Sequence, residues 1–209
     1  MFNQNEWQTR LSTVMPALEG WCTTEKALKL VEVIITNQIH QIIEIGIYGG
    51  KSLIPMALAV KEVNPAGRCF GIEAWDTKIA IEEKTSIEND DWWAKLDIIR
   101  IKNDFLKYIT QSSLTEIIRI IELPVTEGLA IFMKKRYRNK IGLIHIDGNH
   151  SERQAFHDVK MAYTILPADG VIVLDDIDWH SLAKAHTWLR KRSKTIFEAS
   201  SFGIYQIHK

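Results

Sequence analysis

A glycine-rich turn follows an apolar, β-branched segment and precedes a helical pattern. The turn runs Glu44–Ile45–Gly46–Ile47–Tyr48–Gly49–Gly50–Lys51–Ser52. In open α/β sheets, ligands bind outside the carboxyl ends of the strands, beside turns of this kind. Glycine allows the backbone to approach a ligand closely or to adopt a positive φ. These residues therefore predict a ligand-binding turn.

The glycine-rich turn can be compared with several known kinds of ligand-binding turn. A dinucleotide-binding fold requires G-x-G-x-x-G, and the second glycine is missing after Gly46. A P-loop requires four residues between its glycines before Lys-Ser, whereas Gly46 and Gly50 enclose only three before Lys51 and Ser52. An acidic residue followed by Gly-x-x-Gly-Gly suits a ligand with an amino-acid tail. A tight turn without a ligand is the remaining alternative.

A second acidic residue ends the next predicted strand. Glu73 is followed by Ala74 and Trp75. A carboxylate at this position can accept both ribose hydroxyls of a bound nucleoside, as in dinucleotide-binding folds. Alternatively, Glu73 is a solvated acid at the end of a strand. Trp75 either flanks an adenine ring or packs against the edge of the sheet.

Three aspartates follow two later apolar strands. Asp147 ends one of them, and Asp175 and Asp176 end the next. If the two strands are neighbours, their tips lie about 5 Å apart, and the carboxylates repel unless a cation lies among them. Oxygen ligands favour Mg²⁺, Mn²⁺ or Ca²⁺. Alternatively, these aspartates cap helices or face water, or they hold the metal of a P-loop ATPase.

Histidines and a pair of adjacent tryptophans could contribute to an acceptor site. His150, just after Asp147, has an imidazole that could act as a general base near neutral pH, although a structural role is also open. His145 lies within an apolar strand and is expected to be a core residue whose hydrogen-bonding groups are satisfied. Trp92 and Trp93 either line an acceptor site or anchor a helix to the sheet, and we favour the anchor.

The elements that must position these residues alternate between strand and helix patterns. Strands are expected at Gln41–Ile47, Arg68–Ala74, Thr115–Leu123, Lys140–Asp147, Gly170–Asp175, Thr195–Ala199 and Gly203–His208. Their near-continuous apolar runs favour a parallel sheet covered on both faces, and the alternation favours a doubly wound α/β fold. The last two strands are too close in sequence for a crossover helix, so we expect an antiparallel hairpin.

Length and composition limit the remaining possibilities. The chain has 209 residues, with 26 Lys+Arg and 26 Asp+Glu. We expect one globular unit, with residues 1–40 as a helical cap and 41–209 as the ligand-binding domain. Zero net charge disfavours nucleic-acid binding. Two cysteines, no signal-peptide pattern and no long apolar run favour a cytoplasmic location without membrane partners.

The sequence resembles the class I S-adenosylmethionine-dependent methyltransferases over nearly its whole length. The resemblance rests on Glu44-x-Gly46-x-x-Gly49-Gly50, on Glu73 and on the terminal segment 202–205. Within that class, segments 146–151 and 174–176 resemble the metal-dependent O-methyltransferases that modify sugar hydroxyls of macrolide and aminocoumarin antibiotics. The resemblance implies a mostly parallel, Rossmann-like seven-stranded sheet with a reversed last strand.

The resemblance also implies roles for single residues. Gly46, Tyr48, Gly49 and Ser52 would surround the methionine part of the cofactor, and Glu73 would hold the ribose. Asp147, Asp175 and Asp176 would bind a divalent metal, with Mg²⁺ the expected ion. Some relatives use an aspartate as base at the position of Asn149, where this chain has an amide, and others use a histidine at the position of His150.

We therefore predict S-adenosylmethionine-dependent, metal-assisted O-methylation of a small metabolite. His150 and Asp147 are the predicted catalytic residues. The predicted cofactor contacts are Glu44, Gly46, Tyr48, Gly49, Gly50, Ser52, Glu73, Ala74 and Trp75. The alternatives are a non-catalytic cofactor-binding protein and a nucleotide hydrolase that uses Lys51, Ser52 and Asp175. The tryptophans are compatible with a homo-oligomer, and the acceptor is not specified.

Overall fold

The computed structural model describes residues 2–81, 86–134, 137 and 139–209. Within this part of the chain, seven strands form one sheet in the order β3-β2-β1-β4-β5-β7-β6. The strands are β1 (Gln41–Ile45), β2 (Arg68–Ile72), β3 (Ile118–Ile121), β4 (Leu143–Ile146), β5 (Val171–Asp175), β6 (Ser193–Glu198) and β7 (Phe202–Ile207). All neighbours are parallel except that β7 runs antiparallel to β5 and β6. The predicted doubly wound sheet with a reversed last strand is confirmed.

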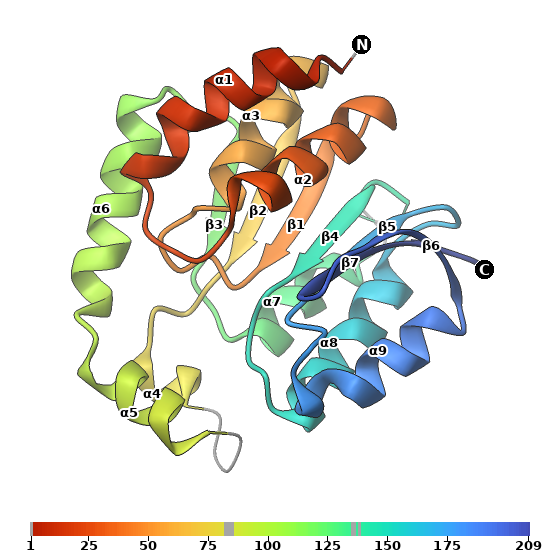
Figure 1. Ribbon diagram of the computed structural model, residues 1–209. Helices are drawn as coiled ribbons and strands as arrows, with labels where there is room; N and C mark the ends of the chain where they lie inside the picture. Colours follow the sequence, from red (N-terminus) through yellow and green to blue (C-terminus); the bar gives the residue numbers. More distant parts are fainter. Residues whose placement is uncertain (1, 82–85, 135–136, 138) are drawn as a thin grey trace.

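Helices cover both faces of this sheet (Figure 1). They are α1 (Gln4–Val14), α2 (Thr24–Thr36), α3 (Leu53–Val63), α4 (Thr77–Ala80), α5 (Ile87–Lys95), α6 (Ile98–Gln111), α7 (Val125–Phe132), α8 (Glu152–Ile165) and α9 (Ala183–Arg190). Short 3₁₀ helices occur at η1 (Met15–Ala17) and η3 (His180–Leu182). Among the described residues, no helix combines the length and the apolar character that crossing a membrane requires.

The hydrophobic core has two layers, one on each face of the sheet. Residues from α1, α2, α3 and α6 pack on one face, and residues from α7, α8 and α9 pack on the other. Successive residues of a strand point to opposite faces, so Ile42 belongs to the first layer and Ile43 to the second. Since the N-terminal helices share a core with α3, they are packed as part of the same globular unit.

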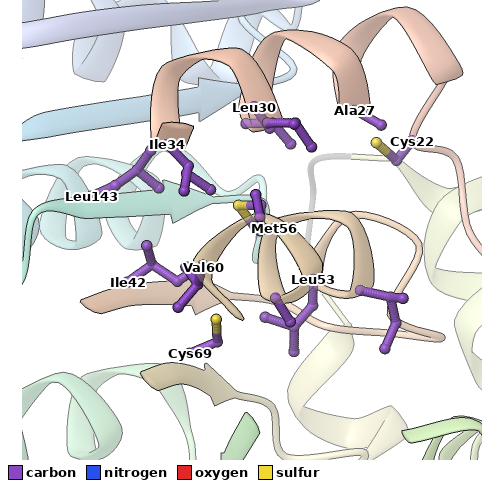
Figure 2. Packing of buried hydrophobic residues seen from close by; sticks show 14 of the residues in the cluster. Cys22, Ala27, Leu30, Ile34, Ile42, Leu53, Met56, Val60, Cys69 and Leu143 are labelled. Carbon is purple, nitrogen blue, oxygen red and sulfur yellow. The ribbon is translucent and has the colours of Figure 1, made fainter. Parts of the chain in front are cut away.

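The packing of α2 on α3 fixes the helix that carries Lys26. Leu30 and Ile34 of α2, Met56 of α3 and Ile42 of β1 are fully buried in one apolar layer (Figure 2). Lys26 lies one helical turn before Leu30 and is also buried. The hydrophobic core therefore fixes a buried lysine in the first turn of α2.

The register of the strands brings the predicted site residues to one edge. Ile45 of β1 pairs with Ile72 of β2 and with Ile146 of β4, and Ile146 pairs with Leu174 of β5. The residues immediately after these positions are Gly46, Glu73, Asp147 and Asp175. Because the four strands are parallel, these residues lie side by side at the carboxyl edge of the sheet.

The closeness of this packing generates a stability prediction. A Cβ on Gly46 would lie 1.8 Å from the carbonyl oxygen of Asp147, and Gly46 adopts φ +80°. We expect Gly46→Ala to lower the free energy of unfolding by at least about 2 kcal/mol in urea denaturation. The control is Gly148→Ala, where the only heavy atom near the new Cβ is Ile45 Cγ2 at 3.0 Å. Equal losses in the two variants would contradict this account of the turn.

Candidate active site

The glycine turn packs against the tips of two strands. Gly46 and Gly50 adopt φ values of +80° and +82°, which favour glycine. The Gly46 amide donates a hydrogen bond to the carbonyl of Ile72 at 3.1 Å, while its Cα faces the carbonyl of Asp147. The turn is therefore held between β2 and β4, with its backbone exposed to the space above the sheet.

Glu73 fixes the same turn from β2. Its Oε2 accepts hydrogen bonds from the amides of Ile47 at 3.1 Å and Tyr48 at 3.2 Å, and its Oε1 accepts from the amide of Trp75 at 3.0 Å. The Trp75 indole donates to the carbonyl of Tyr48 at 3.1 Å. The carboxylate therefore lies beside the glycine turn, where a ligand bound on that turn can reach it.

Glu44 anchors the turn from below. Its side chain is fully buried, and Oε1 accepts a hydrogen bond from the Ser52 hydroxyl and lies 2.8 Å from His145 Nδ1. Burial raises the pKa of Glu44, and the hydrogen bonds from His145 and Ser52 act in the opposite direction. The start of α3 is thereby tied to β1 and β4. His145 is a core residue, as predicted, although its Nε2 makes no hydrogen bond.

A lysine lies among the predicted metal ligands. The Lys26 ammonium contacts Asp175 Oδ2 directly and lies 3.6 Å from Asp147 Oδ2. Only 5% of Lys26 and 9% of Asp175 are exposed. The cation that the aspartates require is therefore supplied, in this structure, by the chain itself.

The charges of this cluster shift one another's pKa values. Burial raises the pKa of Asp175 to about 6; the Asp147 carboxylate adds to this, and Lys26 opposes it. Burial lowers the pKa of Lys26, but the carboxylates of Asp147 and Asp175 outweigh it and hold that pKa above its ordinary value. Lys26 is therefore positively charged at neutral pH.

His150 and Asp176 form a second pair at the same edge. His150 Nε2 lies 2.7 Å from Asp176 Oδ2, and the imidazole stacks on Trp179 with ring centroids 4.4 Å apart. Asp176 adopts φ +51°. Asn149 Oδ1 accepts a hydrogen bond from the amide of Ser151. The imidazole is thus oriented by a carboxylate and a ring.

One cavity of about 600 Å³ joins the glycine turn to the acidic cluster. Its walls also include the loop before α2, helix α5 and the hairpin between β6 and β7. Figure 1 shows α4 and α5 near the carboxyl ends of β1 and β2. The volume lies within the range of about 300–1,000 Å³ that is typical of small-molecule sites.

Aromatic rings form one wall of this cavity. The ring centroid of Tyr48 lies 4.9 Å from that of Trp21 and 5.9 Å from that of Trp93, and Trp92 lies 5.1 Å from Trp21. Trp21 is 66% exposed and Trp92 is 37% exposed. Trp92 and Trp93 both line the cavity, so the alternative interpretation applies to both, while Trp93 also packs against the hydrophobic core, as the favoured interpretation of an anchor requires.

The structure divides the predicted site residues into two groups. The cavity is lined by Gly46, Tyr48, Ser52, Glu73, Ala74, Asp147, His150, Asp175 and Asp176. Its lining does not include Glu44, Gly49, Gly50 and Trp75. A Cβ on Gly49 would meet the Glu19 carbonyl oxygen at 2.5 Å, and the Trp75 ring packs near Phe105. These four residues therefore support the turn on the side that faces away from the cavity.

The prediction from the sequence missed Lys26 and Trp21. Both come from the first 40 residues, which had been interpreted only as a helical cap. Lys26 carried a usable signal, because it shares the apolar stripe of α2 with Leu30 and Val33 at i+4 and i+7. A charged residue on the buried face of a helix requires a partner, and Asp175 is that partner.

A comparison with known protein families identifies the family of this chain. Residues 43–177 match the model of a family described as "Methyltransferase domain". The chain belongs to this family. The matched segment contains the glycine turn, Glu73 and all three aspartates of the acidic cluster. No curated protein matches the chain by sequence.

Solved structures agree with the methyltransferase fold. The O-methyltransferase TomG from Streptomyces achromogenes, in complex with S-adenosylmethionine, is 14% identical, with 100% of each chain covered and a TM-score of 0.68. A putative O-methyltransferase from Klebsiella pneumoniae is 13% identical, covering 99% of this chain and 88% of that chain, with a TM-score of 0.66. An O-methyltransferase from Bacillus cereus with bound S-adenosylhomocysteine is 15% identical, covering 100% and 93%, with a TM-score of 0.64.

The three predicted metal ligands Asp147, Asp175 and Asp176 of this methyltransferase do not converge in one group. Among the described residues, potential ligand atoms converge in two groups: His145 with Asp147 and Asp175, and Asp147 with His150 and Asp176. Lys26 contacts the two aspartates of the first group. In the second group, the His150 and Asp176 ligand atoms are bonded to each other. The three-aspartate site and Mg²⁺ stay predictions.

The burial of Cys22 beside Lys26 yields a chemical test of this end of α2. Burial raises the pKa of Cys22 to about 12 and that of Cys69 well above its ordinary value. Alkylation requires the thiolate, so we expect iodoacetamide to modify both thiols at least about 100-fold more slowly in native protein than in urea. Mass spectrometry measures the rates. Rapid native labelling of Cys22 would show that the loop before α2 opens.

Proposed function

We propose that this methyltransferase moves the methyl group of S-adenosylmethionine to a hydroxyl group of a small molecule. The observation that carries the proposal is the single cavity in which the glycine turn and Glu73 face the acidic cluster and His150. One half of the cavity has the chemistry to bind the cofactor, and the other half has the chemistry to bind a hydroxyl and remove its proton. The O-methyltransferase neighbours support this division.

The cofactor half fits a nucleoside with an amino-acid tail. Gly46 lines the cavity, and because it has no Cβ the turn packs directly against the Asp147 carbonyl at the tip of β4. The Glu73 carboxylate is positioned by two turn amides and is proposed to bind the ribose hydroxyls. Tyr48 and Ala74 also line this half and would contact the cofactor.

The acceptor half would align the hydroxyl and take its proton. When bound, S-adenosylmethionine supplies a sulfonium methyl carbon that an acceptor oxygen displaces, releasing S-adenosylhomocysteine and one proton. His150 is the proposed base, and the bond from its Nε2 to Asp176 orients the ring and stabilises its protonated form. Asp147 would hold the acceptor at the boundary between the two halves, since it lines the cavity next to Gly46.

The remaining predictions belong to this proposal as open components. Mg²⁺ is the ion predicted from the sequence, and no step is assigned to it because Lys26 contacts Asp147 and Asp175. A small-molecule acceptor, a cytoplasmic location, the lack of nucleic-acid and membrane partners, and the oligomeric state stay predictions. The hydrolase alternative loses support because Ser52, one of the residues it would use, donates to buried Glu44.

Binding of S-adenosylhomocysteine tests the cofactor half. We expect calorimetry to detect binding in the presence of a chelator, and Glu73→Gln to weaken it by about tenfold or more, because a hydrogen bond from ribose to a carboxylate is lost. The control is Glu122→Gln, which changes the exposed acid after the neighbouring strand β3. Absence of binding to the wild-type protein would contradict the proposal.

Turnover tests the proton-transfer role of His150. With an acceptor found by screening hydroxyl compounds, we expect His150→Gln to lower kcat by about 10²–10⁴ while S-adenosylhomocysteine affinity changes little. His157→Gln on α8 is the matched control, because His157 lies outside the cavity. A wild-type pH–rate profile in the His150 variant would remove it from the mechanism. Cofactor binding without turnover on any acceptor would favour the non-catalytic alternative.

A further inference from the structure

Lys26 places a buried positive charge where the sequence predicts a divalent metal. Its ammonium contacts Asp175 Oδ2 and lies 3.6 Å from Asp147 Oδ2. The side chain of Lys26 is 6% exposed, while that of Asp147 is 31% exposed and opens to the cavity. Lys26 itself is part of the cavity wall. The ammonium is therefore both paired with the carboxylates and adjacent to the space for an acceptor.

The fold holds Lys26 in this position. Thr23 caps α2 by accepting a hydrogen bond from the Lys26 amide at 3.1 Å, and Ala27 and Leu30 are fully buried in the core. The ammonium lies 6.0 Å from the centroid of the Phe202 ring. The backbone of Lys26 is therefore held by a helix end that is both capped and packed.

We propose that Lys26 is the permanent cation of this site, replacing a divalent metal. Its charge compensates Asp147 and Asp175, excludes a metal ion from these two carboxylates, and leaves an N–H donor for the acceptor oxygen. The last element rests on the proposed function, whereas the exclusion of metal does not. This methyl transfer proceeds without a divalent cation at Asp147 and Asp175.

Electrostatics and geometry support this replacement. A magnesium ion on Asp147 and Asp175 would need oxygen ligands at about 2.0–2.1 Å in nearly octahedral geometry. The Lys26 ammonium already contacts Oδ2 of Asp175. A metal ion bound to that atom and the ammonium would therefore compete for one position and repel each other. An ammonium has three N–H donors, of which two suffice for the two carboxylates. The third can reach an acceptor.

Manganese binding tests the proposal without requiring knowledge of the acceptor. Mn²⁺ is titrated by electron paramagnetic resonance into wild-type protein, Lys26→Met and Lys29→Met, each without S-adenosylhomocysteine. Lys29 is the matched control, because it lies on the same helix, is partly exposed and pairs with Glu32. We expect Lys26→Met to bind Mn²⁺ at least about tenfold more tightly than the other two proteins. Asp175→Asn in the Lys26→Met background should then abolish the gain.

The Mn²⁺ affinities decide whether Lys26 occupies a cation site. Equal Mn²⁺ affinity in wild type and Lys26→Met overturns the proposal, whether both bind or neither binds, because Lys26 would then not occupy a cation site. Removing Lys26 leaves two carboxylates uncompensated and could lower stability. The melting temperature is therefore measured as well, and Mn²⁺ should raise it for Lys26→Met alone. S-adenosylhomocysteine binding is followed separately, so a failure of the proposed function shows there and not in the Mn²⁺ titration.

Discussion

The buried ion pair between Lys26 and Asp175 joins parts of the chain that are distant in sequence. Lys26 comes from helix α2 near the start of the chain, whereas its partners Asp147 and Asp175 lie at the carboxyl ends of β4 and β5. A buried carboxylate without a partner is strongly unfavourable, so the position of α2 and the position of the strand tips constrain each other. The cavity lies between α2 and the carboxyl ends of the strands, and the ion pair between Lys26 and Asp175 forms part of its polar end.

Asp147 connects the two halves of the cavity. Its backbone carbonyl faces the Cα of Gly46 so closely that no side chain fits there, while its carboxylate lies 3.6 Å from Lys26. A shift of the β4 tip would therefore move both the glycine turn and the acidic cluster. Behind them, buried Glu44 links Ser52 to His145 and stiffens the same edge. Such rigidity suits a reaction that depends mainly on alignment of a methyl group and an oxygen.

The sheet and the glycine turn were predictable because their signals are local. Apolar runs such as 141–146 and 171–174 indicate buried parallel strands, and parallel strands bring residues such as Glu73 and Asp147 to one edge. The apolar stripe of α2 indicates that Lys26 is buried, but which carboxylates it meets depends on how α2 docks, and no local pattern specifies that docking. The same holds for Trp21 and Trp92, whose rings meet only after α5 packs near the loop before α2. Sequence spacing located the carboxylates correctly, but it did not identify the cation between them.

The most direct test of the account is a crystal structure of the protein with S-adenosylhomocysteine and Mn²⁺, measured with anomalous scattering at the manganese edge. The account predicts S-adenosylhomocysteine in the cavity against the glycine turn and Glu73, with the Lys26 ammonium between Asp147 and Asp175 and no anomalous peak there. An anomalous peak bonded to these two carboxylates, with Lys26 displaced, would contradict it. Ligand density elsewhere in the molecule would contradict the assignment of the cavity itself.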